Sequence, residues 1–213
     1  MEKALQIALN KYEYIGPEMD DFDTFSKLPD DYQQILREKN GYIRFSGALH
    51  IRGCCNSPLW HSLQNCWTGE LSLARFYPAI QDEDIPFAQN ALGDQFILRN
   101  NIVHYMYGET GGLLCLNMEI NEFLMKVEDD PLNYLNCWEI EMFLANGNQL
   151  KPGELLHAYP PLCTDQAANG ISLTAVPMEQ QIFANAQLSE RLSTKPKQRL
   201  LKNLINRMFL KKK

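Results

Sequence analysis

The sequence predicts an α+β fold in which a twisted antiparallel sheet is flanked by helices and followed by a C-terminal helical extension. Helical and strand-like segments occur in separate groups along the chain, without a regular βαβ alternation. Apolar residues in the middle of the chain recur with period two, and turn residues separate them. The composition, 45% hydrophobic and 22% charged, is that of a globular protein with a sizeable core.

The first third of the chain predicts three helices from apolar residues at helical spacing. The clearest is LPDDYQQILREKNG, in which Pro29 suits the first turn. Asp30 and Asp31 complement the positive end of the helix dipole, and Gly41 ends the helix in a left-handed conformation. In the third helix Ser57 is the expected N-cap. The three segments are residues 2–12, 28–41 and 57–67.

Strands are predicted where the period is two. Residues 42–52, YIRFSGALHIR, alternate loosely and predict a strand pair. A three-strand antiparallel meander follows over residues 95–116, with turns at Asn100-Asn101 and at GETGG, residues 108–112. The other expected elements are helices at 118–127, 132–144 and 178–192 and a strand at 172–177.

Composition divides the chain into three parts. Residues 1–145 form the expected α+β domain. Residues 146–194 begin with many turn residues and predict an extension that packs on this domain. Residues 195–213 predict a basic amphipathic helix. Its apolar stripe consists of Leu200, Leu201, Leu204, Ile205, Met208 and Phe209.

Charge is distributed unevenly between these parts. Residues 195–213 hold eight Lys or Arg and no acid, so residues 1–194 carry 12 basic and 26 acidic side chains, a net charge of −14. The basic helix has three alternative docking places, namely its own acidic domain, an anionic membrane or a partner protein. We favour the first of these. The acidic body argues against nucleic-acid binding and suits a protein partner with a basic surface, although acidity also aids solubility alone.

A search for catalytic or metal-binding motifs finds none. Cys54, Cys55, His61 and Cys66 are close in sequence, but their spacing does not converge as a four-ligand zinc site requires. GETGG lacks the Lys-Ser/Thr of a phosphate loop, so it is interpreted as a turn. No nucleophile motif and no assignable pair of carboxylates is present. We therefore expect neither an enzyme nor a cofactor.

The N-terminal sequence and the cysteines indicate a compartment. MEKALQIALNKY lacks the long apolar run of a signal peptide, and no run approaches the roughly 18 residues that span a bilayer. We expect a cytoplasmic protein whose six cysteines are reduced and mostly buried.

The pair Gly93-Asp94, in ALGDQF, precedes the first strand of the meander. Gly93 is expected to supply the backbone freedom for a sharp turn. Asp94 is expected to close the turn through local hydrogen bonds from its side chain to the backbone.

Three segments in order resemble a known family. LPDDYQQILREKNGY (28–42), IPFAQNALGDQFIL (85–98) and INEFL (120–124) resemble the SUKH superfamily, the Smi1/Knr4-like group. The resemblance covers about residues 20–135. It implies an α+β fold with a twisted antiparallel sheet. It also implies a binding role, since bacterial members resemble immunity proteins that neutralise toxins and fungal members resemble signalling scaffolds.

The resulting hypothesis is a non-enzymatic, cytoplasmic immunity protein that binds a polymorphic toxin with a basic surface, such as a nuclease. The alternative is a regulatory or scaffold protein that binds a cellular partner without a toxin. Acids in loops are the candidate contacts, unless they are merely solvated turn residues. They are Asp20, Asp21, Asp23, Asp82, Glu83, Asp84 and Glu109.

Overall fold

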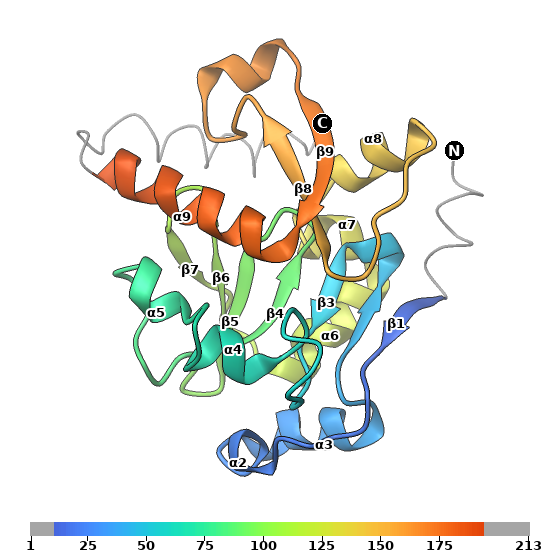
Figure 1. The fold of residues 1–213 in the computed structure, drawn as a ribbon, viewed down its shortest axis with the longest axis vertical. Helices are drawn as coiled ribbons and strands as arrows, with labels where there is room; N and C mark the ends of the chain where they lie inside the picture. Colours follow the sequence, from blue (N-terminus) through green and yellow to red (C-terminus); the bar gives the residue numbers. More distant parts are fainter. Residues whose placement is uncertain (1–10, 194–213) are drawn as a thin grey trace.

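The computed structural model describes residues 11–193 and contains a seven-stranded, wholly antiparallel sheet whose strand order follows the sequence (Figure 1). Helices cover the sheet, which confirms the α+β prediction. A second, two-stranded sheet consists of β8 (Glu154–Tyr159) and β9 (Ser172–Pro177). The strands of the large sheet are β1 (Tyr12–Ile15), β2 (Tyr42–Arg44), β3 (Leu49–Ile51), β4 (Ile85–Asn90), β5 (Gln95–Arg99), β6 (Ile102–Met106) and β7 (Leu113–Cys115).

The helices lie on both faces of the large sheet and at one of its ends. α6 lies behind the sheet in Figure 1, α4, α5 and α9 lie in front of it, and α2 and α3 lie below it. The helices are α2 (Phe22–Phe25), α3 (Asp30–Glu38), α4 (Leu63–Trp67), α5 (Leu73–Phe76), α6 (Ile120–Asp129), α7 (Pro131–Tyr134), α8 (Glu139–Ala145) and α9 (Met178–Ser193), with 3₁₀ turns η1 (Phe45–Gly47) and η2 (Asp165–Asn169).

Alternation along β5 divides the core between the two faces. Phe96 packs on Phe123 of α6, with ring centroids 4.7 Å apart. Ile97, the next residue, belongs to a second cluster that includes Ile182 of α9. Because both faces are covered, the strand is buried on both sides, although a period-two pattern alone is typical of a sheet with one solvated face.

The segment LPDDYQQILREKNG contains α3, as predicted, but Gly41 does not end the helix. The helix ends at Glu38 and Lys39 after it is extended, so Gly41, with a φ of 77°, lies in the turn to β2. The helix begins at Asp30 directly after Pro29 and buries Tyr32 and Leu36 on one face. The Tyr32 hydroxyl donates a hydrogen bond of 2.7 Å to the carbonyl of Arg52, which fixes α3 against the end of β3.

Two predicted helices differ from the structure. The helix expected from Ser57 begins at Leu63 with Ser62 as its cap, because Leu63 N–H donates to Gly53 O at 2.9 Å and the preceding residues form turns. The helix expected over 132–144 is two helices, because Asn136 between them has a φ of 48°.

The ends of the chain also differ from expectation. Tyr12, predicted as the last residue of a helix, begins β1 instead, while residues 2–10 of that helix lie outside the described residues. The predicted basic helix 195–213 lies outside them too. Between residues 11 and 193, no helix combines the length and the apolar character that crossing a membrane requires.

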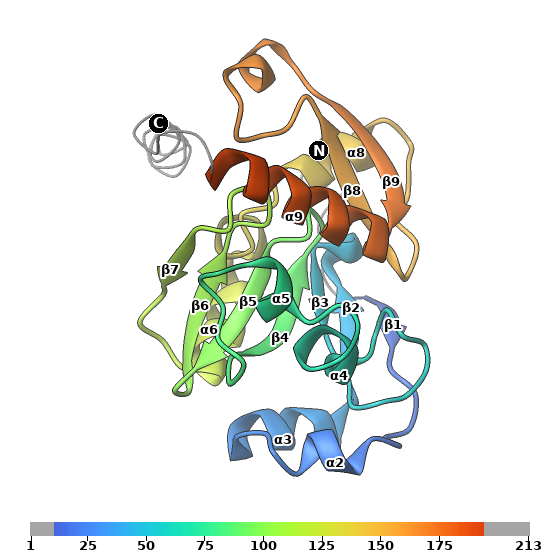
Figure 2. The same ribbon diagram turned by 60° about the vertical axis from the view of Figure 1, so that its left-hand side comes forward.

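The extension packs across the top of the sheet (Figure 2). It contains the predicted strand and helix as β9 and α9, and β8 was not predicted. Leu156 N–H donates to Ala91 O at 2.7 Å, and the Asn185 side chain donates to Leu92 O at 3.1 Å. These bonds join β8 and α9 to the turn between β4 and β5; the domain boundary at residue 145 stays a prediction.

Candidate protein-binding surface

The Gly-Asp turn is closed by a residue that the sequence analysis did not consider. The Asn90 side-chain oxygen accepts hydrogen bonds from the backbone N–H of Leu92 and of Asp94, both at 3.0 Å. Gly93 has a φ of 81°, which confirms why glycine is needed there.

Asp94 itself reaches beyond its own turn. Its carboxylate accepts a 2.7 Å bond from Gly108 N–H and a bond from the Tyr105 hydroxyl, both on or after β6. The expectation of a purely local role is therefore corrected, because the antiparallel register brings the start of β5 opposite the end of β6. The pair Gly93-Asp94 is a structural link between two turns.

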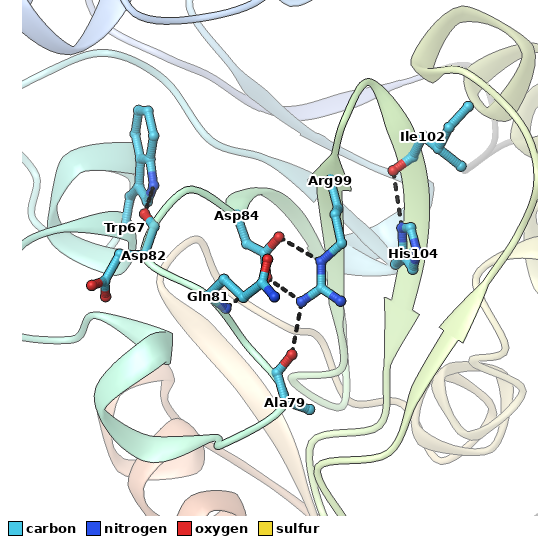
Figure 3. A network of polar contacts seen from close by, with 8 residues as sticks. All are labelled: Trp67, Ala79, Gln81, Asp82, Asp84, Arg99, Ile102 and His104. Carbon is cyan, nitrogen blue, oxygen red and sulfur yellow. Dashed lines mark hydrogen bonds and ion pairs between the residues drawn. The ribbon is translucent and has the colours of Figure 1, made fainter.

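Asp84 is buried and paired with Arg99 (Figure 3). Arg99 Nε donates to Asp84 Oδ1 at 2.8 Å and Arg99 Nη2 donates to Asp84 Oδ2 at 2.5 Å. The Asp84 residue is 2% exposed. Its expected place in a solvated acidic turn is thus corrected, because β5 brings a guanidinium to the start of β4 and the pair replaces contact with water.

Asp82 and Glu83, in the same loop, are exposed. The backbone carbonyl of Asp82 accepts a 2.9 Å bond from Trp67 Nε1 at the end of α4. The loop is therefore fixed through its backbone, and the Asp82 carboxylate points away from the Asp84–Arg99 pair (Figure 3).

The three acids of the α2 segment have different surroundings. Asp21 caps α2 by accepting from Thr24 N–H at 3.1 Å. Asp20 accepts from Asn56 N–H at 2.8 Å and stays exposed. Asp23 is exposed on the first turn of the helix. The carboxylates of Asp20 and Asp21 thus help to hold the chain locally.

Glu109 lies at the other end of the sheet, in the turn between β6 and β7. Its two oxygens accept from Leu162 N–H at 2.9 Å and Cys163 N–H at 2.7 Å. Burial raises the pKa of the Glu109 carboxyl. The structure therefore separates Glu109 from the other candidate acids and places it between the sheet and the extension.

An open hollow lies where the start of α3 meets the turn between β5 and β6. The hollow has a volume of about 470 Å³, and Leu28, Leu98 and Ile120 contribute apolar side chains to it. Asp30 and Asp31 line it as well. From the sequence these two residues are expected only to complement the helix dipole, because nothing local indicates that the α3 N-terminus meets the β5–β6 turn.

We name this surface the acidic end. Lys27 also lines the hollow, so the surface is not wholly acidic. We include the loop before β4 in this surface. β4 begins at Ile85, which pairs with Leu98, and Leu98 lines the hollow. The acids of this surface are Asp20, Asp21, Asp23, Asp30, Asp31, Asp82 and Glu83, of which Asp30 and Asp31 line the hollow.

A network of buried polar side chains connects β3 and β4 of the large sheet. Arg52 Nη2 donates to Gln89 Oε1 at 2.6 Å, and Gln89 Nε2 lies 3.2 Å from His50 Nδ1. His50 Nε2 lies 2.9 Å from His61 Nδ1, and His61 Nε2 lies 2.8 Å from the carbonyl of Asn40. No local pattern predicts this network, since the partners of the histidines are distant in the sequence.

These hydrogen-bonded side chains are buried. His50 and Gln89 line a cavity of about 10 Å³, the size at which a single water begins to fit. Burial lowers the pKa of His50 well below its usual value and that of His61 to about 4. The lowered pKa values keep the two buried imidazoles neutral at pH 7.

The cysteines near His61 do not form a metal centre with it. No three of the His, Cys, Asp and Glu side chains in residues 11–193 are placed to hold a metal ion. Cys54, Cys55 and Cys66 are buried free thiols, and burial raises the pKa of Cys54 to about 12.

Comparison of the sequence with protein-family models and with curated proteins gave no match. The acidic end is therefore characterised by its own geometry: a hollow that Asp30 and Asp31 line. It lies at the end of the molecule where α2 and α3 are found (Figures 1 and 2).

Proposed function

We propose that this protein is a non-enzymatic binding module whose acidic end binds a protein with a basic surface. The observation that carries the proposal is the open hollow that Asp30 and Asp31 line together with Leu28, Leu98 and Ile120. Apolar contacts at the centre and charges at the rim are the usual anatomy of a protein interface. The charges increase the rate of association and select a basic partner.

Phe22 provides an exposed anchor on the same segment. It lies between Asp21 and Asp23 at the start of α2 and is 66% exposed. Exposed aromatic side chains are frequent binding hot spots, so Phe22 is the expected centre of the apolar contact.

The partner class follows from the resemblance to SUKH immunity proteins. A nuclease toxin holds phosphates in a basic cleft, and an acidic surface can occupy that cleft in place of the nucleic acid. We infer that this protein neutralises such a toxin by blocking its cleft. The alternative, a regulator or scaffold without a toxin, uses the same surface for a cellular partner.

The first test is the neighbouring gene: a toxin module encoded there supports the immunity role, and its absence favours the regulator. Where such a module is found, the second test is its co-expression with this protein. Rescue of growth and a complex on purification support the proposal. No rescue together with no complex overturns the immunity role.

The surface is tested by charge reversal in the purified complex. The variant Asp82→Lys/Glu83→Lys should slow association about tenfold at low salt and flatten its salt dependence. A matched control is Glu179→Lys/Glu190→Lys, two exposed acids on α9, which should leave the rate within about twofold. Phe22→Ala should weaken binding about 30-fold, as expected for loss of a hot spot. Equal effects of the two double variants would place the interface elsewhere.

A further inference from the structure

Within residues 11–193, the outer edge of β9 carries backbone groups that make no hydrogen bond. Leu156 N–H on β8 donates to Ala91 O, so it points away from β9. In an antiparallel ladder, directly opposed residues turn their N–H and C=O groups the same way, either both inward or both outward. Ala175, the partner of Leu156, therefore directs its N–H and C=O away from β8. Leu173, two residues earlier, does the same.

A second bond agrees with this assignment. Met178 N–H donates to Gly153 O at 2.9 Å, which extends the ladder at the alternate positions. Between residues 11 and 193, no hydrogen bond to the outward groups of Leu173 or Ala175 is present.

The edge lacks the features by which proteins usually prevent strand pairing. β9 has the sequence SLTAVP, with no charged residue, and its pairing with β8 is continuous over six residues. Edge strands are normally protected by Lys, by bulges or by very short length. Pro177 lacks an N–H, but it lies at the last position of the strand. β7, an edge of the large sheet, has three residues.

We propose that β9 pairs antiparallel with β9 of a second copy of this chain. The two outward-facing residues, Leu173 and Ala175, flank Thr174 symmetrically. With a two-fold axis at Thr174, Leu173 of one copy meets Ala175 of the other, and each pair exchanges two hydrogen bonds. The outward donors and acceptors of one copy therefore match those of the other. The two β8–β9 hairpins then form one four-stranded sheet.

The side chains of β9 suit this register. Leu173 and Ala175 are partly buried against the main core, so the apolar face of the joined sheet is continuous. Thr174 is exposed and faces its own copy, a favourable cross-strand pair. Since β9 carries no charge, the pairing opposes no like charges.

The position of β9 leaves the acidic end free. β9 lies at the top of the molecule in Figure 1, whereas α2 and α3 lie at the bottom. A strand–strand contact is smaller than the roughly 800 Å² per partner of a standard interface. The dimer is consequently weak and forms at high protein concentration.

Disulfide trapping tests the register. Cys115 is an exposed free thiol, so the experiment uses the full chain with Cys115→Ser. In this background Thr174→Cys should form a disulfide-linked dimer under mild oxidation, because opposed Cα atoms of a non-hydrogen-bonded pair are about 4.5 Å apart. Ser172→Cys is the control on the same face. Its symmetry mate lies about 13 Å away, four residues along the strand, and it should cross-link at least tenfold more slowly. Equal rates for the two variants overturn the proposal.

Ala175→Pro tests the hydrogen bonds. Proline is tolerated on an edge strand where the lost N–H faces outward, but its ring blocks an added strand. Sedimentation equilibrium should show the wild type dimerising with rising concentration and the variant monomeric, with the same melting temperature at low concentration. A wild type that stays monomeric contradicts the dimer. A lower melting temperature of the Ala175→Pro monomer also contradicts it, because another part of the same chain would then cover the edge.

Discussion

His50 and His61 stack with ring centroids 5.1 Å apart and share a hydrogen bond of 2.9 Å. The carbonyl of Asn40 only accepts, so His61 Nε2 carries a proton and His61 Nδ1 accepts from His50 Nε2. His50 Nδ1 then accepts from Gln89. Each imidazole has one proton and one occupied acceptor nitrogen, and a second proton on either ring would break this one-directional chain.

Acid should therefore destabilise the fold through these histidines. Burial lowers both pKa values, that of His61 to about 4, while an unfolded histidine titrates near 6.5. As the pH falls below about 6.5, the unfolded state binds protons that the folded state does not. The free energy of unfolding should fall by up to about 1.4 kcal/mol per pH unit for each histidine down to about pH 4. Urea denaturation between pH 7.5 and 4.5 measures this.

His50→Gln isolates the contribution of the histidine pair. Glu109 acts in the opposite direction. Burial raises the pKa of its carboxyl, so its protonation on acidification increases the free energy of unfolding. Removing one histidine should reduce the slope below pH 6.5 by about half, whatever the stability at neutral pH. A wild-type slope no steeper than that of the variant would show that His50 titrates normally in the folded state.

Asp84→Asn should destabilise the protein although Asp84 lies in an acidic loop. The substitution removes the negative partner of Arg99 and one acceptor for its two nitrogens. We expect a loss of about 2 kcal/mol in the free energy of unfolding, as for hydrogen bonds to charged groups. The matched control is Asp82→Asn, two residues away and exposed, which should stay within about 0.5 kcal/mol. Similar losses for both variants would contradict the burial of the pair.

Glu109→Gln should loosen the contact between the extension and the sheet. A glutamine retains one acceptor oxygen, so one of the N–H groups of Leu162 and Cys163 loses its partner. We expect a loss of about 1 kcal/mol, partly offset because no charge is buried. Hydrogen exchange at these two amides should become faster. The control is Glu179→Gln, an exposed position on α9. Equal exchange rates in the two variants would contradict the proposed role of Glu109 in holding the extension.

Local signals were sufficient for several elements. Asn100 and Asn101 form the expected two-residue turn with φ values of 51° and 64°, a conformation that asparagine tolerates. α3 and α9 follow from apolar spacing, because one face of each meets the core.

Other elements depended on distant partners. The segment after Ser57 has helical spacing, but its backbone bonds to Gly53 and the buried side chain of His61 prevent an early helix. The predicted helix ending at Tyr12 conflicts with the β2 edge, which pairs with Tyr12 as a strand. In both cases tertiary hydrogen bonds outweigh a weak local preference.

The sequence by itself determined the fold class and the acidity of the body, because periodicity and composition are local properties. The tertiary structure alone decided which of these carboxylates are exposed. Asp82 and Asp84 belong to the same run, QDED, yet one is exposed and the other is buried. The physical reason is register: Ile85 pairs with Leu98, which places the guanidinium of Arg99 next to Asp84 and leaves Asp82 in water.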